Sequence, residues 1–331
     1  MGKANDPRMA AARTYAAADH DWHIDAAMSE IAIQYALDPA MYIAPQILPV
    51  VNVGKESDKF YIWDREDWFR IPTSTLRARR TAPKVVEPSV SSAGYHVKNY
   101  MLEGQIPFED LANADAALDL ENSTTRYVTQ LLMLDQENRI ASLLTTAGNT
   151  GSGNALSGTN RWDDYANSSP ISDVNTGKNW VHLETGQPVT TMVVGHQVHN
   201  ALIQHPDMID RIKYVQAATQ ATVEKAIADI FGVKTYLIGS AVKNTGEELQ
   251  AASMGFVWGK NVILLHVPPA PARNIPSAGY SFRWKPEGFT DFVVETKDDE
   301  DIKARRKRVG YFQDEIITGK QLFYLLTTVV N

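Results

Sequence analysis

The stretch DLENSTTRYVTQLLMLDQENRIASLLTTAG, residues 119–148, predicts one long amphipathic helix. A stripe of mostly apolar side chains recurs at alternating spacings of four and three residues, which places its members on one helix face. The stripe consists of Tyr127, Leu131, Leu134, Asn138 and Ala141, and it is widened by Val128, Leu132 and Leu144. Arg126, Gln130 and Glu137 are expected on the other side.

The sequence also indicates where this helix begins and ends. Asp119 is expected to cap its N-terminus, Asp135 and Arg139 to pair one turn apart, and Gly148 to end it. A helix over residues 119–147 would be roughly 40 Å long, at 1.5 Å per residue. Because a helix of that length needs packing partners along its whole length, we expect it to be a spine for the segments before and after it.

Composition excludes several classes of protein. The chain has 331 residues, 44% of them hydrophobic and 21% charged, as expected for one elaborate or two ordinary globular domains. It has no cysteine, which excludes disulfides, thiolate metal sites and cysteine nucleophiles. A formal net charge of −7 argues against a general nucleic-acid binder. We find neither a membrane-spanning run nor a signal peptide, and expect synthesis inside the cell.

Two extended segments precede the helix. Residues 1 to about 30, which are Ala-rich with scattered charge, are expected to be a mobile arm that becomes ordered only against a partner. In residues 31–53, Pro39, Pro45 and Pro49 prevent a continuous helix, and the apolar side chains predict an extended ribbon that lies across another surface. Residues 55–105 alternate in the manner of strands around a polar section, residues 72–93. They predict a two-stranded excursion with a basic tip that needs a surface to lie on.

The remainder of the chain predicts a connecting loop, a block of helices and strands, and a C-terminal sheet. Residues 148–180 are expected to be loop, and residues 185–275 a compact α/β block. Its expected strands are residues 188–194, 234–238, 254–258 and 262–267, and its expected helices are residues 196–204, 208–218 and 222–231. Three strands, residues 289–296, 303–312 and 322–330, are expected to form a C-terminal sheet, and an acidic turn joins the first two.

No pattern favours catalysis. His196, His199 and His205 lack the carboxylate of a zinc-protease motif, so we interpret them as surface or capping residues. The glycine-rich residues 148–158 lack the Gly-Lys-Ser/Thr ending of a phosphate loop, which favours a flexible link. No serine-nucleophile motif occurs. We therefore expect no enzyme activity, no catalytic residue, no metal and no cofactor.

The charged residues predict contacts between subunits instead. The basic run KARRKR, residues 303–308, could bind nucleic acid, but four consecutive acids at residues 298–301 would oppose a phosphate backbone. We expect an ion-pair seam between copies of the chain. The residues expected at such contacts are Arg77, Arg79, Arg80, Lys84, Asp298, Asp299, Glu300, Asp301, Arg305, Arg306 and Arg308.

The order of these parts resembles a tailed-bacteriophage major capsid protein of the HK97-fold family. YIAPQILPVVNVGKESDKFYIWDREDWFR resembles that family's passage from arm to extended loop, and NADAALDLENSTTRYVTQLLMLDQENRIASL its spine helix. GFTDFVVETKDDEDIKARRKRVGYF resembles its peripheral sheet and loop. The resemblance implies an α+β fold: an N-terminal arm (1–54), an extended β loop (55–105), a peripheral domain (106–184 and 281–331, with the spine helix and the peripheral loop) and an axial α/β domain (185–280).

The resemblance also implies function and partners. Hexamers and pentamers would build an icosahedral shell around double-stranded phage DNA, packaged without sequence specificity. A scaffolding protein and a portal during assembly, and a decoration protein, are implied partners. The chain would assemble in the host cytoplasm, reside in the virion and bind no membrane. An encapsulin-like compartment housing a cargo enzyme shares this fold and is one alternative. An intracellular hydrolase with an unrecognised site is the alternative of another class.

Overall fold

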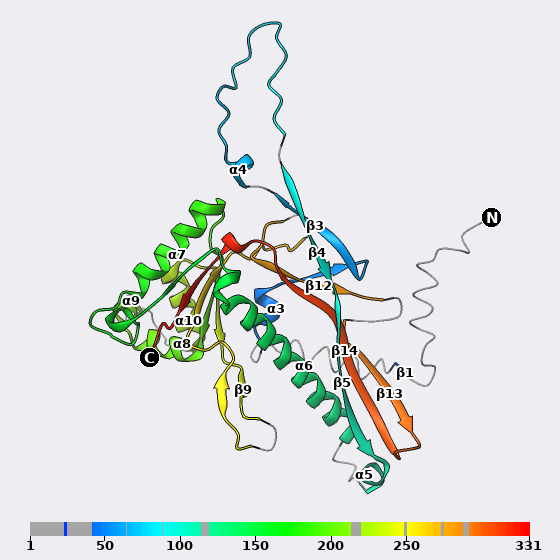
Figure 1. The fold of residues 1–331 in the computed structure, drawn as a ribbon. Coiled ribbons are helices and arrows are strands. Elements are labelled where there is room, and N and C mark those ends of the chain that lie inside the picture. Colours follow the sequence, from blue (N-terminus) through cyan, green and yellow to red (C-terminus); the bar gives the residue numbers. More distant parts are fainter. Residues whose placement is uncertain are drawn as a thin grey trace, which may run out of the picture.

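The structure, a computed structural model, describes residues 23–24, 42–63, 65–87, 89–113, 119–212, 220–247, 250–272, 275–286 and 291–331. Two sheets share one long helix, and a loop stands well away from both (Figure 1). The arm predicted over residues 1–54 lies largely outside these ranges.

The first sheet has five strands in the order β6-β15-β11-β7-β8. They are β6 (Ser152–Ala155), β15 (Phe323–Thr327), β11 (Val262–Leu265), β7 (Thr191–Gly195) and β8 (Thr235–Gly239). β11 is antiparallel to both β7 and β15, whereas the outer pairs are parallel. The side chains of β11 alternate between two apolar cores, as strand geometry requires. Val262 and Leu264 face one core, and Ile263 and Leu265 face the other.

Helices cover both faces of this sheet. One core contains residues of α7 (Pro170–Thr185), α8 (His196–Gln204), α9 (Pro206–Ile212) and α10 (Gln220–Phe231). The other core contains residues of α3 (Ala44–Ile47) and of the C-terminal half of α6 (Leu120–Thr145). A short hairpin, β9 (Val242–Asn244) with β10 (Met254–Phe256), projects from this block (Figure 1). The expected α/β block is therefore present.

The second sheet has six strands built around β14 (Ala304–Ile317). β14 pairs with β13 (Val293–Asp299), β12 (Gly279–Trp284) and β5 (Lys98–Pro107). β1 (His23–Ile24) and β2 (Val50–Val53) are the outer strands next to β13 and β12. The N-terminal half of α6 packs on this sheet through Val128, Leu132 and Met133. One helix thus joins both sheets, which is the spine that the sequence predicts.

The ends of α6 largely agree with prediction, but its buried face does not. The Asp119 side chain accepts a hydrogen bond from the Asn122 N–H at 3.0 Å, and Asp135 pairs with Arg139. The helix ends at Thr145, before Gly148. Tyr127 is 62% exposed, although it belongs to the predicted buried stripe. Buried positions extend around more than half of the helix, and they are Thr125, Val128, Thr129, Leu132, Met133, Gln136, Glu137, Ile140, Ala141 and Leu144.

The extended loop begins as a hairpin of β3 (Ser57–Trp63) with β4 (Val90–His96). Its base packs on the six-stranded sheet, where the Tyr95 and Phe282 rings stack with centroids 4.7 Å apart. The predicted two-stranded excursion is therefore present. Residues 65–68, expected to belong to a strand of the excursion, form the helix α4 (Arg65–Trp68) instead. Strand β5, also expected in the excursion, belongs to the six-stranded sheet and is followed by α5 (Phe108–Asn113).

Two other expectations are wrong. Residues 148–180 are not simply loop, because they contain β6 and most of α7. Gly177 weakens the helix signal in the sequence, but a Cβ at this position would lie 2.7 Å from Leu264 Cδ1, so the close packing of α7 on the sheet requires glycine. In addition, the three C-terminal strands do not form one sheet. β15 pairs with β11 and β6, away from β13 and β14.

Candidate assembly surfaces

The tip of the extended loop carries four exposed cations. Arg77, Arg79, Arg80 and Lys84 lie in residues 69–87, where the structure has neither helix nor strand. In the described part of the chain, none of the four has a carboxylate partner. The backbone hydrogen bonds at the tip are local, such as that from the Thr81 N–H to the Ala78 carbonyl at 3.4 Å. These charges therefore face solvent in the isolated subunit.

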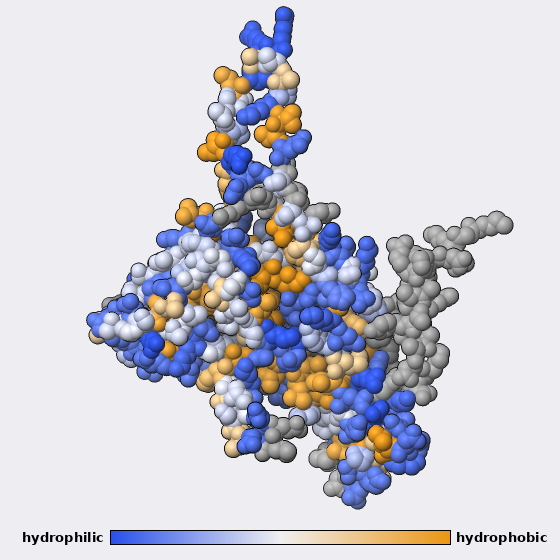
Figure 2. Space-filling model, in the orientation of Figure 1, coloured by the Kyte–Doolittle hydropathy of each residue, from blue (hydrophilic) through white to orange (hydrophobic). Residues whose placement is uncertain are grey.

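Apolar side chains are exposed on the same loop. Ile71 is 90% exposed, Leu76 91%, Val85 77% and Val86 71%. Figure 2 shows apolar patches that alternate with hydrophilic residues along the projecting loop. The expectation of a merely polar section is therefore incomplete. Several large apolar side chains exposed on one loop favour a site of protein contact, because leaving them in water is unfavourable.

The basic run on β14 lies within an ion-pair ladder, which comprises Glu103, Glu121, Glu295, Asp298 and Asp299 with Arg305, Arg306, Lys307 and Arg308. The register of the strands determines which residues pair, because Arg305 lies opposite Asp298 on β13, and Arg308 lies opposite Glu103 on β5. Arg305 Nε lies 2.7 Å from Asp298 Oδ1, and Arg306 Nε lies 2.9 Å from Glu103 Oε1.

The ladder lowers the pKa values of two of its acids, Glu121 and Asp298. Burial alone would raise the pKa of Glu121, but hydrogen bonds from Lys307 and Arg305 outweigh it and lower this pKa. A hydrogen bond from Arg305 is the largest cause that lowers the pKa of Asp298. The side chains of the basic run thus have acidic partners in their own chain. Whether they also form a seam between subunits stays a prediction, and Glu300 and Asp301 remain exposed at the turn.

Sequence reasoning missed a third feature, the buried carboxylate of Glu137. Its oxygens accept hydrogen bonds from Trp258 Nε1 at 2.6 Å and from the Ala44 N–H at 2.8 Å, with the Ile43 N–H at 3.4 Å. Burial raises the pKa of Glu137, whereas these donors act to lower it. The carboxylate therefore joins the spine helix, the five-stranded sheet block and α3. A glutamate in a helix normally predicts an exposed face, so nothing in the sequence indicated this role.

The three histidines that the sequence singled out have separate surroundings. His199 Nδ1 lies 2.9 Å from the Tyr236 hydroxyl, His205 Nε2 lies 3.1 Å from Ser168 Oγ, and the ring of His196 stacks on Phe256. Among the described residues, no three histidine or acidic side chains come together as metal ligands would. The glycine-rich segment forms β6 and short turns, and Gly153 lies directly against the Leu325 backbone.

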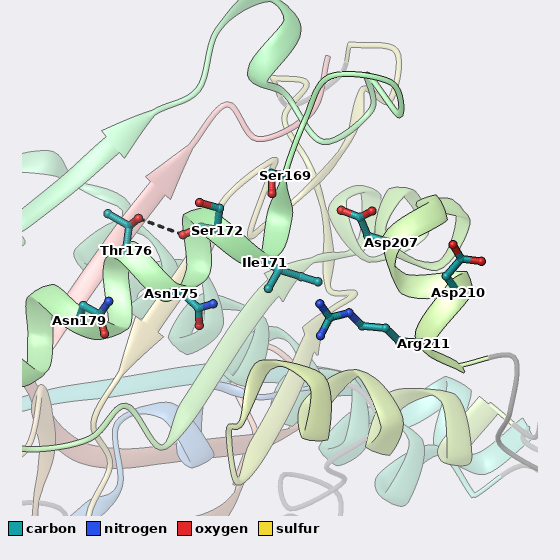
Figure 3. Close-up of a pocket in the computed structure, with 9 residues that line it drawn as sticks. All are labelled: Ser169, Ile171, Ser172, Asn175, Thr176, Asn179, Asp207, Asp210 and Arg211. Carbon is teal, nitrogen blue, oxygen red and sulfur yellow. Dashed lines mark hydrogen bonds between the residues drawn. The ribbon is translucent and has the colours of Figure 1, made fainter.

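A shallow hollow of about 690 Å³ lies between α7 and α9 (Figure 3). Hydroxyl and amide side chains from α7 line one side, and Asp207, Asp210 and Arg211 from α9 line the other. In Figure 3, Arg211 points toward Ile171, away from both acids. The lining residues include no histidine, lysine or cysteine to activate a nucleophile. This hollow offers polar and charged contacts from two helices.

Two sheets on one spine helix, with a loop projecting far from the body, define the HK97-type capsid fold, and the comparisons agree. A phage-related protein from Bordetella bronchiseptica RB50 superposes with a TM-score of 0.70, at 22% identity, over 92% of this chain and 97% of that one. The capsid structure of the cyanophage P-SCSP1u gives a TM-score of 0.56 at 11% identity, over 85% and 86% of the two chains. The predicted fold is confirmed.

Sequence comparison finds phage relatives. The major capsid protein of Burkholderia phage BcepMu is 26% identical over 279 residues, which is 82% of this chain and 87% of the relative. That of Pseudomonas phage JBD67 is 26% identical over 313 residues, or 93% and 97%. No family model matches the chain. The resemblance to phage major capsid proteins that the sequence predicts is confirmed. No helix among the described residues could span a membrane.

Proposed function

We propose that this chain is the major capsid protein of a phage, and that copies of it assemble into a closed icosahedral shell around double-stranded DNA. The likeness to two phage capsid proteins over most of the chain supports this function. The observation that carries the assembly mechanism is the extended loop, whose exposed apolar and basic side chains have no surface to pack on within the described chain. A neighbouring copy provides that surface.

The domain assignment is part of the proposal. The axial domain at the centre of each hexamer and pentamer is residues 185–280 together with β6, α7 and β15, which complete the five-stranded block. The six-stranded sheet and α6 form the peripheral domain, with the rest of residues 106–184 and 281–331. Within the arm, residues 1–54, the part that precedes α3 is proposed to reach a neighbour. Scaffolding protein, portal and decoration protein are proposed partners, with assembly in the host cytoplasm. Shell building requires no catalytic residue.

The loop tip is proposed to bind an acidic surface of the adjacent copy. One exposed ion pair contributes only about 0–1 kcal/mol. Arg77, Arg79 and Arg80 act together, because arginine can bind carboxylates through two parallel hydrogen bonds. The exposed apolar side chains beside them add burial of apolar surface. Asp301 and Glu300, at the exposed turn between β13 and β14, are the candidate partners.

Expression with and without a co-expressed scaffolding protein, followed by negative-stain electron microscopy, tests the proposed function. We expect closed shells of uniform diameter. DNA inside particles from infected cells, with a portal at one vertex, would identify a phage capsid, whereas an enclosed enzyme would identify the compartment alternative. A chain that stays monomeric under all of these conditions would contradict the proposal.

A further inference from the structure

The carboxylate of Glu137 is a charged group in an otherwise apolar core. The Glu137 side chain is fully buried, between the spine helix and the five-stranded sheet. Its partners Ile43, Ala44 and Trp258 belong to the apolar core that also contains Ile140 and Ala141 of α6 and Ile263 of β11. Its hydrogen-bond partners among the described residues are N–H donors of Trp258, Ala44 and Ile43. A buried charge in such a place is costly unless directed donors satisfy it.

The walls of this site belong to the body of the subunit. The Trp258 indole lies against Gly239 of β8, so closely that a Cβ there would be 2.3 Å from Trp258 Cδ1. Asn261 Nδ2 donates to the Trp258 carbonyl at 3.1 Å, which holds the backbone of the indole residue. Helix α6 forms the other side of the site and supplies Glu137. Ile43 and Ala44, by contrast, come from the segment before β2 and bind to this site, which we call the socket for residues 43–44.

The segment seated in this socket connects the two extended parts of the chain. Residues 43–53 comprise α3 and β2, and β2 pairs in parallel with β12. They are the last part of the expected arm, residues 1–54, and the extended loop starts directly after them at β3. The position of residues 43–53 therefore sets the point on the body from which both the arm and the loop leave.

We propose that Glu137 is a positioning residue for assembly, and that its carboxylate fixes residues 43–53 in one register on the body. Apolar contacts of Ile47 and Leu48 hold α3 in the core, but such contacts are non-directional and tolerate small displacements. Hydrogen bonds to two consecutive backbone N–H groups admit one register only. The consequence for shell geometry rests on the proposed capsid function, whereas the register itself is a property of the single subunit.

Hydrogen–deuterium exchange of the unassembled full-length chain tests the register directly. Glu137→Gln keeps the size of the side chain but cannot accept from all three donors, because its Nε2 is itself a donor. We expect amide exchange in peptides covering residues 43–53 to accelerate about tenfold or more, while β11 exchanges as in wild type. Asp135→Asn, on an exposed carboxylate of the same helix, is the matched control and should leave both regions unchanged.

Assembly of the same variants tests the consequence. Glu137→Gln subunits should stay folded but give open or aberrant particles where wild type and Asp135→Asn close shells. Unchanged exchange at residues 43–53, or a uniform acceleration across the whole body, would overturn the positioning role. Local acceleration with normal closed shells would overturn the assembly role. If wild type itself forms no shell, the capsid function fails, while the exchange data still decide whether Glu137 positions the segment.

Discussion

The ammonium group of Lys307 lies 2.7 Å from the carboxylate of Glu121, and the Lys307 side chain is only 1% exposed. This contact fastens the first turn of the spine helix α6 to the central strand β14. Arg305 contributes a second contact to the same carboxylate at 2.6 Å. The Glu121 carboxylate thus pairs with the buried Lys307 and with the half-buried Arg305 where the helix meets the sheet.

Glu121→Gln should lower the free energy of unfolding by about 2–3 kcal/mol, because breaking a buried pair leaves its cation poorly compensated. Urea unfolding followed by circular dichroism measures this change. Glu300→Gln is the control, since Glu300 pairs with Lys303 at a position where both side chains are mostly exposed. The control should change stability by less than about 1 kcal/mol. Equal effects of the two substitutions would contradict the importance of the buried pair.

The same pair predicts a pH dependence. The pKa of Glu121 is lowered in the folded chain, so its contribution is complete above its ordinary value of 4.5 and is lost as pH falls through the folded-state pKa. The stability difference between wild type and Glu121→Gln should therefore be large at pH 7 and shrink at pH values below about 4.5. Denaturant unfolding at several pH values measures it. A difference that grows toward low pH would contradict the sign of this shift.

Gly177→Ala should destabilise the subunit although alanine favours helices. The new methyl group would lie 2.7 Å from Leu264 Cδ1 and 2.8 Å from Tyr324 Cδ1, which forces α7 away from the sheet. We expect a loss of about 1–3 kcal/mol from overpacking, larger than the gain of about 1 kcal/mol in helix propensity. Asn175→Ala, at an exposed position of the same helix, should be neutral or slightly stabilising. Thermal unfolding of both variants measures the two changes in stability. A Gly177→Ala variant that is more stable than wild type would show that α7 packs less closely on the five-stranded sheet than described.

Replacing Arg77, Arg79 and Arg80 together by glutamate should leave the subunit folded but block shell closure. All three are exposed, so stability should be unchanged, while repulsion would replace attraction at every contact with a neighbour's acids. Light scattering during assembly and circular dichroism of the subunit measure the two effects. High salt should weaken wild-type assembly in the same direction. Normal yields of closed shells from the triple variant would mean that the tip remains in solvent.

Local signals in the sequence predicted local features well. The Asp119 cap, the Asp135–Arg139 pair and the bounds of α8 depend on residues within one or two helical turns, and the structure has all three. Gly177 shows where such signals fail. Glycine lowers helix propensity, but its lack of a side chain is what allows α7 to lie close to β11 and β15.

The face of α6 could not be predicted because two sheets and α3 surround it. A stripe with helical period identifies the buried side only when a helix packs on one layer. Glu137 lies outside the predicted stripe, yet it is fully buried because α3 and Trp258 supply its hydrogen bonds from distant parts of the chain. β15 was assigned to the wrong sheet for a similar reason, since strand pairing depends on contacts across the chain.

A cryo-electron microscopy reconstruction of the assembled particle would show directly where the extended loop lies. We expect an icosahedral shell in which residues 70–87 of each copy lie on an adjacent copy, with Arg77, Arg79 and Arg80 beside carboxylates of that neighbour. A purified chain that never assembles, or a shell in which these residues project into solvent without touching a neighbour, would contradict it.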